Sequence, residues 1–183
     1  ARALADSEAL KLRSVNSKIK IFLLHGPSTN TIKKINMNNI IPIVNSLDQL
    51  KIVRKYAEKY RLKISTALHF DTGMSRLGLD ENETKILLHN KSILNNLDIC
   101  LIMSHLACGD DKKNPINQLQ LHKFKNIKKH FIGVKATLSN SAGIFLGKSY
   151  HFDLVRPGIA LYGGNPLLKR KLKLNNIIKL KAK

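Results

Sequence analysis

The property of this sequence that most constrains its fold is a repeated alternation of short apolar runs with segments of helical periodicity. Strands are expected over the apolar runs 17–26, 38–46, 63–70, 97–107 and 135–141, and a last strand–turn unit is expected over 152–164. Helices are expected over 46–62, 80–94 and 114–131, where Ser46 is a suitable N-cap and Pro115 a suitable first residue. Strands that are apolar along their whole length are typical of a parallel sheet with helices on its faces. The sequence therefore predicts an α/β fold.

Two architectures fit this alternation, an open doubly wound sheet and a (β/α)8 TIM barrel. The expected strands are fewer than the eight of a complete barrel, so a barrel would be incomplete. No GxGxxG motif follows the first expected strand, which counts against a dinucleotide-binding sheet. Pro42 cannot donate a hydrogen bond to a neighbouring strand, and it predicts that 38–46 is an irregular or edge-like strand.

Composition and charge limit the function classes. The chain has 183 residues, 43% of them hydrophobic, as in ordinary globular domains. No apolar run reaches the roughly 18–20 residues of a membrane helix. The net charge of +20 allows a basic nucleic-acid-binding module, but the lysines are scattered and aromatic residues make up only 5%, which indicates no base-stacking surface. Cys100 and Cys108 form no CxxC motif, and a reducing, cytoplasmic setting is expected.

Polar residues gather where the expected strands end. They are Asp71, Arg76, His105, Asn140, Ser141, Arg156 and Gly158. Both candidate architectures bind ligands at the carboxyl ends of their strands, so these side chains could converge on one pocket. The sequence contains no Ser-His-Asp order, zinc-binding spacing or Walker loop, and no metal is predicted.

More than one interpretation is open for each of these residues. The loops after the last two strands can form a phosphate site from backbone N–H groups with an arginine nearby, or they can be ordinary Asn/Ser/Gly turns. His105 can be a catalytic residue or a hydrogen-bonded core histidine. Arg76, behind a glycine turn, is well placed to hold a carboxylate or phenolate with its planar guanidinium.

Four stretches of the chain together resemble motifs of the bacterial alanine racemases, in order and approximate spacing. The stretches are FDTGMSRLGL, MSHLACGDD, SNSAGI and HFDLVRPGIALYGGNP. The resemblance runs over nearly the whole chain. It implies an enzyme of fold type III that depends on pyridoxal 5′-phosphate (PLP) and interconverts L- and D-alanine for peptidoglycan synthesis. It further implies a (β/α)8 barrel, a C-terminal β-domain and a head-to-tail homodimer.

The same resemblance implies roles for individual residues. Arg76 is similar to the arginine that contacts the phenolic oxygen of the cofactor and the substrate carboxylate. His105 is similar to the histidine that lies against the pyridine ring, and Arg156 to the arginine that hydrogen-bonds the pyridine nitrogen. The positions that match phosphate-binding residues are Ser141, Gly158 and Ile159, with Asn140 beside them.

Several features of the family pattern are missing from these residues. The Schiff-base lysine lies in a Val-Lys-Ala-Asn-Ala-Tyr-Gly-His context that does not occur here; Lys135 shares only Val-Lys-Ala and lies at the wrong end of its strand. Tyr162 does not match the tyrosine that acts as the second base. His69 stands where many relatives carry a carbamylated lysine. We expect a catalytically inert fragment, with a partial barrel over 1–172 and the start of a connection to a C-terminal domain over 173–183.

Other functions stay open at this point. A degenerate or split-gene fragment would carry these motifs without activity, and gene context would reveal it. A nucleic-acid-binding module would show an affinity that falls steeply with salt. Other fold-type III proteins, such as amino-acid decarboxylases and small PLP carriers, share the barrel but match the four motifs less well.

Overall fold

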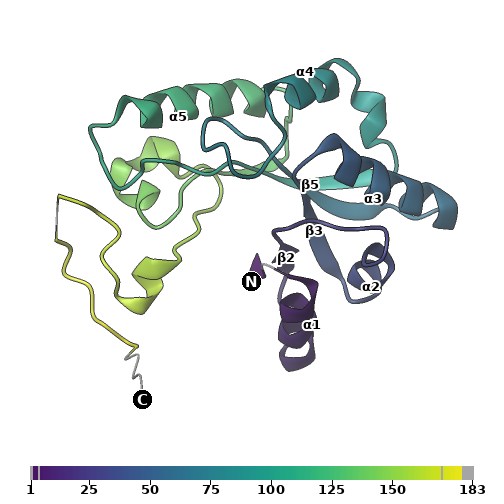
Figure 1. Cartoon of the computed structure of the whole chain (residues 1–183), viewed down its shortest axis with the longest axis horizontal. Helices are drawn as coiled ribbons and strands as arrows, with labels where there is room; N and C mark the ends of the chain where they lie inside the picture. Colours follow the sequence, from purple (N-terminus) through teal and green to yellow (C-terminus); the bar gives the residue numbers. More distant parts are fainter. Residues whose placement is uncertain (1, 4, 170, 179–183) are drawn as a thin grey trace. The chain divides into compact units, whose positions relative to one another are not determined.

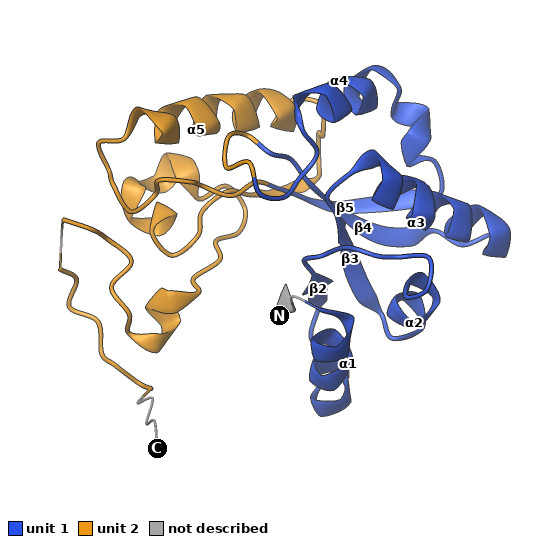
Figure 2. Cartoon of the chain, viewed as in Figure 1, with its two compact units in different colours: residues 1–71, 76–103 blue, residues 72–75, 104–183 orange. Residues whose placement is uncertain are grey.

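The structure is a computed structural model that describes residues 2–3, 5–169 and 171–178. The chain divides into two compact units, which Figure 2 colours separately. Unit 1 comprises residues 1–71 and 76–103, and unit 2 comprises residues 72–75 and 104–183. Each unit is described by itself.

Unit 1 alternates parallel strands with helices (Figure 1). Each strand pairs in parallel with the next one in sequence: β1 (Arg2–Ala3), β2 (Ile21–Leu23), β3 (Ile40–Val44), β4 (Ile64–His69) and β5 (Leu97–Met103). The helices are α1 (Asp6–Val15), α2 (Ile32–Met37), α3 (Leu47–Tyr60), α4 (Glu81–His89) and the short 3-10 helix η1 (Lys91–Leu94). This parallel β–α alternation confirms the predicted α/β class. The residue patterns predicted neither β1 nor the helices α1 and α2.

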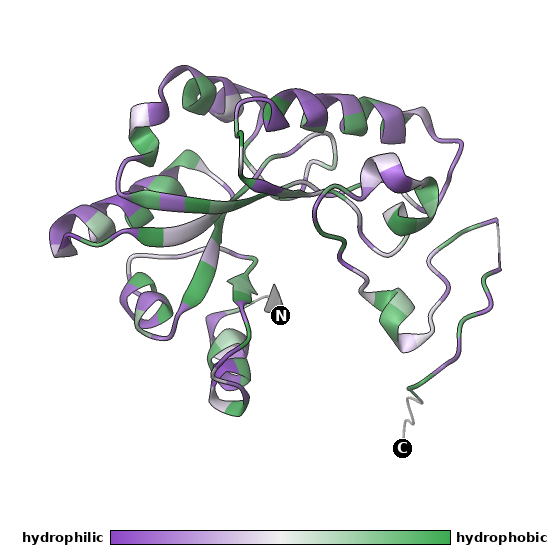
Figure 3. Ribbon diagram, turned by 180° about the vertical axis from the view of Figure 1, so that it is seen from behind, coloured by the Kyte–Doolittle hydropathy of each residue, from purple (hydrophilic) through white to green (hydrophobic). Residues whose placement is uncertain are grey.

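Both faces of the unit 1 sheet are apolar, which is why its strands read as continuous hydrophobic runs. In β2, Ile21 and Leu23 pack in a core that includes Ala9 of α1 and Ile35 of α2. The alternate residue Phe22 packs on the other face, in a core built from residues of β3, β4 and β5. Figure 3 shows these strands largely in the hydrophobic colour, whereas the helices carry both colours.

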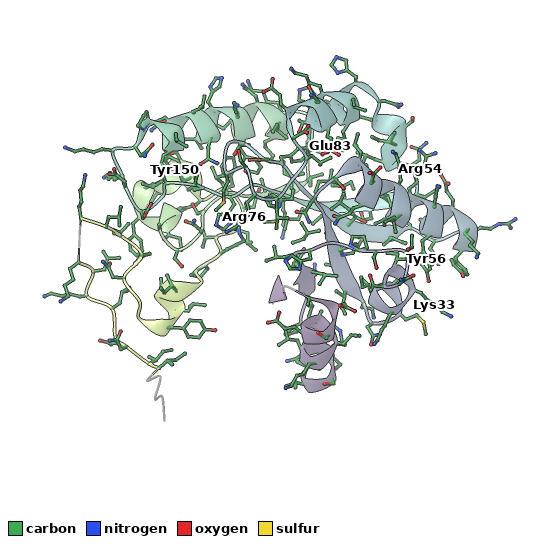
Figure 4. All side chains as sticks on the ribbon, in the orientation of Figure 1. Lys33, Arg54, Tyr56, Arg76, Glu83 and Tyr150 are labelled. Atoms are coloured by element: carbon green, nitrogen blue, oxygen red, sulfur yellow. The ribbon has the colours of Figure 1, made fainter. Side chains whose placement is uncertain are left out.

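Local sequence signals determine where the helices of unit 1 begin. The Ser46 hydroxyl accepts a hydrogen bond from the Gln49 N–H at 3.2 Å, so the predicted N-cap of α3 is confirmed. At α4, Asp80 and Glu83 form a reciprocal capping box. Glu83, labelled in Figure 4, also accepts a hydrogen bond from the Leu47 N–H at 2.8 Å. One carboxylate therefore satisfies backbone donors at the starts of two helices.

Of the two alternatives predicted from Pro42, an irregular or an edge-like strand, the edge-like one is wrong. β3 lies between β2 and β4, with Leu23 opposite Pro42 in the parallel register. The first part of β3, residues 40–42, pairs with β2, and residues 43–44 pair with β4. Pro42 thus lies where β3 changes partner, and its missing N–H is tolerated there.

Unit 2 contains one long helix, one short strand and three 3-10 helices among its described residues. They are α5 (Pro115–Lys128), β6 (Lys135–Thr137), η2 (Gly143–Leu146), η3 (Lys148–Tyr150) and η4 (Ile159–Tyr162). α5 begins as predicted, with Pro115 in its first turn and the Asn114 side chain accepting from the Ile116 N–H at 3.0 Å. Within the part of the chain that the structure describes, no helix is both long and apolar enough to cross a membrane.

The strand in the predicted strand–turn unit over 152–164 is wrong. Residues 153–156 do lie beside β6, because the Asp153 N–H donates to the Ala136 carbonyl and the Arg156 N–H donates to the Ser139 carbonyl. Pro157 then removes the next donor, and the chain passes through Gly158 into the 3-10 helix η4. The apolar residues of this run lie in a turn and a short 3-10 helix. The spacing of apolar residues in so short a run does not distinguish such a segment from a strand.

Candidate functional site

In unit 2, the guanidinium of Arg156 is held by acceptors around the end of β6. Nη1 donates to the Thr137 hydroxyl at 2.6 Å, and Nη2 donates to the carbonyls of Ser104 at 2.6 Å and Leu138 at 3.1 Å. The Arg156 N–H is also bonded to Ser139 at 2.9 Å. Hydrogen bonds to a charged donor are stronger than neutral ones, so this half-buried arginine has a fixed orientation.

His105 and Asn140, two predicted site residues, lie in contact in unit 2. The Asn140 Nδ2 is 3.2 Å from the His105 Nε2 and also donates to the Leu106 carbonyl at 3.3 Å. The Asn140 Oδ1 accepts from the Gly143 N–H at 2.9 Å. The loops after β5 and β6 are therefore joined through one amide side chain.

Ser141 lies against the start of η4, next to Gly158 and Ile159. Its hydroxyl accepts from the Ala160 N–H at 3.3 Å. Among the residues that the structure describes, none accepts a hydrogen bond from the N–H groups of Gly158 and Ile159. A hydroxyl next to two available backbone donors is an arrangement suited to an anion such as a phosphate.

Gln120 contacts the predicted site residue His105 and was not predicted from the sequence. This fully buried side chain of α5 accepts from the Ala107 N–H at 2.9 Å and donates to the His105 carbonyl at 2.9 Å and the Thr72 hydroxyl at 3.2 Å. Thr72 in turn shares a 2.7 Å hydrogen bond with the Ser104 hydroxyl. The available signal was a glutamine inside the apolar face of the predicted helix, four residues before Phe124.

In unit 1, Arg76 lies in a loop whose base is closed by backbone hydrogen bonds. The Leu79 N–H donates to the His69 carbonyl at 2.7 Å, and the Asp71 N–H donates to the Leu79 carbonyl at 2.9 Å. Gly78 has φ +114°, and a Cβ there would lie 2.7 Å from the Asp71 nitrogen, so only glycine fits this loop. Arg76 itself is exposed, and Figure 4 labels it.

In unit 1, the side-chain amide of Asn45 holds His69. Its Nδ1 is 2.8 Å from the Asn45 Oδ1, and both side chains are buried. The Asn45 Nδ2 donates to the Leu24 carbonyl at 2.8 Å, which directs the Asn45 oxygen toward the imidazole. The Nδ1 of His69 is therefore the donor in this pair. A polar network thus joins the ends of β2, β3 and β4.

The structure relates the predicted site residues within each unit. The set in unit 2 is His105, Asn140, Ser141, Arg156, Gly158 and Ile159, whereas Arg76 belongs to unit 1. Lys135 is exposed and opens β6, so it lies at the start of that strand as predicted. In the described ranges, no group of three or more His, Cys, Asp or Glu side chains is arranged to hold a metal ion.

The sequence of the chain is similar to a known protein family over most of its length. The family model described as "Alanine racemase, N-terminal domain" matches residues 5–166. The chain belongs to the alanine racemase family. It is 42% identical over 180 residues to an alanine racemase of Rickettsia bellii, with 97% of this chain and 44% of that protein covered. It is also 42% identical to the alanine racemase of Rickettsia canadensis, of which it covers 48%. The chain thus spans less than half the length of these two alanine racemases.

Solved structures of alanine racemases share the fold. A crystal structure from Bartonella henselae, with covalently bound pyridoxal phosphate, matches with a TM-score of 0.90 and 37% identity over 96% of this chain and 51% of that one. The biosynthetic alanine racemase of Pseudomonas aeruginosa matches with a TM-score of 0.81 at 24% identity, a similarity of fold alone. Of the two architectures left open by the sequence, the barrel of the alanine racemase N-terminal domain is therefore the correct one.

Proposed function

We propose that this chain supplies the PLP-binding residues of an alanine racemase that interconverts L- and D-alanine. The observation that carries the proposal is the Ser141 hydroxyl at the start of η4, next to the N–H groups of Gly158 and Ile159. These three residues are the positions at which the family resemblance expects the cofactor phosphate. The family membership of residues 5–166 supports the same assignment.

The residues present fit a phosphate group chemically. Backbone N–H groups at a turn donate to phosphate oxygens without carrying a proton that must be removed, and a serine hydroxyl can donate at the same place. Burial of Ser141 excludes water from part of this surface. A phosphate bound here would gain hydrogen bonds that are stronger than neutral ones.

Arg156 and His105 would contact the cofactor ring. An arginine guanidinium keeps its proton at physiological pH, so Arg156 would donate a hydrogen bond to the ring nitrogen without protonating it. Its bonds to Thr137 and Ser104 fix the guanidinium in advance of binding. When bound, PLP supplies an electron sink for negative charge that develops at the α-carbon of the amino acid.

Arg76 would hold the substrate carboxylate through a charge-assisted hydrogen bond. The closed base of its loop, between His69 and Leu79, limits how far this exposed side chain can move. His69 takes the position of a carbamylated lysine in many relatives, and an imidazole does not carry the negative charge that a carbamate would place next to Arg76.

Racemisation needs a proton acceptor or donor on each face of the α-carbon. None of the 183 residues matches the lysine or the tyrosine that would act as these two bases. We therefore infer that residues 1–183 by themselves bind the cofactor without racemising alanine, and that further polypeptide, including the second subunit of a homodimer, supplies both bases. A cytoplasmic location is part of the same proposal.

A cofactor titration tests this function. The chain should bind pyridoxamine phosphate in preference to pyridoxamine, because the phosphate site supplies the selectivity. Ser141→Ala should weaken binding about tenfold, equivalent to one charge-assisted hydrogen bond of about 1.4 kcal/mol. Ser149→Ala, an exposed serine of η3, is the matched control and should leave the affinity unchanged.

Borohydride reduction of the chain with PLP, followed by peptide mass spectrometry, tests the missing bases. We expect scattered substoichiometric adducts or none. A stoichiometric adduct on a single lysine would contradict the inference that no residue of this chain replaces the Schiff-base lysine. Equal binding of the phosphorylated and unphosphorylated cofactor would contradict the phosphate site.

A further inference from the structure

The contact between His105 and Asn140 joins an imidazole nitrogen to an amide nitrogen. The two atoms, His105 Nε2 and Asn140 Nδ2, are 3.2 Å apart. An asparagine NH2 group can only donate hydrogen bonds. The imidazole nitrogen can accept one only if it carries no proton, so this contact restricts the protonation of His105.

The orientation of the Asn140 amide is determined by two main-chain groups. The Gly143 N–H lies 2.9 Å from Oδ1 and requires an acceptor there, while the Leu106 carbonyl lies 3.3 Å from Nδ2 and requires a donor. Exchanging the amide oxygen and nitrogen would place a donor against the Gly143 N–H and an acceptor against the Leu106 carbonyl. The NH2 group therefore faces His105.

We propose that Asn140 is a positioning residue that keeps His105 neutral, with the ring proton on Nδ1 and an unprotonated Nε2. Its importance for catalysis rests on the proposed function, since His105 is expected to lie against the cofactor ring. The tautomer itself follows from this chain alone. The family resemblance implies no such role for Asn140.

Two side chains hold the main chain at and next to His105. Arg156 donates to the carbonyl of Ser104, the residue before His105 in the chain. The Gln120 bond to the His105 carbonyl holds the backbone at the same point. Asn140 thus orients the ring, while Gln120 orients the main chain.

Nitrogen NMR of the 15N-histidine-labelled 183-residue chain measures the tautomer directly. At about pH 8, above the ordinary histidine pKa of about 6.5, His105 should show one protonated nitrogen, Nδ1, and one unprotonated nitrogen, Nε2. His105→Gln assigns the signals by their disappearance. A protonated Nε2, or an average of the two tautomers, would overturn the proposal.

The chain contains its own control for this measurement. His122 Nε2 and Asn126 Nδ2 are 3.0 Å apart on the exposed surface of α5. This pair has the same two atom types as His105 and Asn140, but it is open to water. Competition from water should give His122 an averaged signal. Should His122 show the same fixed tautomer as His105, the main-chain bonds to Asn140 would not be the cause.

Asn140→Asp reverses the hydrogen-bonding requirement with almost no change in shape. A carboxylate can only accept, so the proton should move to Nε2 of His105. Asn126→Asp should leave the His105 signals unchanged. An unchanged Nε2 in Asn140→Asp would overturn the role of Asn140, and if this variant does not fold, the His105–His122 comparison in the unaltered chain still decides the proposal. These spectra need no cofactor, so a failure to bind PLP would refute the proposed function and leave the tautomer result standing.

Discussion

Replacing Gln120 with methionine tests whether the buried amide of α5 holds the loops around His105. Methionine keeps the side-chain length and the helix propensity, so packing and helix formation change little. Three hydrogen bonds are lost, from the Ala107 N–H, to the His105 carbonyl and to the Thr72 hydroxyl. The first two partners are partly exposed and can bond to water, and Thr72 keeps its bond to Ser104.

The expected magnitude follows from these partners. At about 1 kcal/mol for each hydrogen bond, and with partial replacement by water, Gln120→Met should lower the free energy of unfolding by about 2–3 kcal/mol. Urea denaturation followed by circular dichroism measures this loss. Hydrogen exchange at the Ala107 amide measures the local loss of protection, because that N–H loses its acceptor, and it should become faster in Gln120→Met.

Gln118→Met is the matched control for this experiment. Gln118 lies on the same helix two residues earlier, but its side chain is exposed. Its replacement should change the unfolding free energy by no more than about 0.5 kcal/mol and leave the exchange of Ala107 unaltered. Equal effects of the two substitutions, or full protection of Ala107 in Gln120→Met, would refute the structural reasoning.

Two further predictions concern unit 1. Glu83→Ala removes the acceptor of the Leu47 and Asp80 N–H groups, so it should lower the free energy of unfolding in urea by about 1–2 kcal/mol. The control Glu81→Gln, on the same helix, should lower it little. Similar losses in the two variants would argue against the cap that Glu83 provides to both helices. Burial, assisted by the nearby Asp98 carboxylate, raises the pKa of the Cys100 thiol. Since the thiolate is the reactive form, the alkylation rate of folded Cys100 should rise at higher pH than in the urea-unfolded chain, and an equal or lower midpoint would contradict this shift.

The sequence predicted those parts of the fold that depend on neighbouring residues. Ser46 and Asn114 start helices because their side chains accept hydrogen bonds from N–H groups two or three positions later, which is a local event. The apolar runs of β2 to β5 were visible because both faces of the sheet are buried. The positions of the helices α3 and α5 needed no knowledge of the rest of the chain.

The errors arose where the environment of a residue comes from distant parts of the chain. Pro42 is tolerated inside the sheet because β3 changes partner at that residue, and the pairing of β3 with β2 and β4 is a tertiary property. The run 152–164 is apolar without being a strand, because Pro157 and the contact of 153–156 with β6 redirect it. Neither fact can be read from periodicity.

The residues of the candidate site divide in the same way. The four motifs predicted Arg76, His105 and Arg156 as site residues and suggested the family, which the comparisons confirmed. The sequence did not indicate that Gln120 contacts Thr72, a residue 48 positions away, or that Asn140 restricts the protonation of a histidine 35 positions away. The sequence by itself determined which chemical groups are present and which segments form helices and strands, because these depend on residue type and local spacing. Only the tertiary structure decided which polar groups meet, because a hydrogen bond depends on the position and direction of two atoms, and the fold sets both.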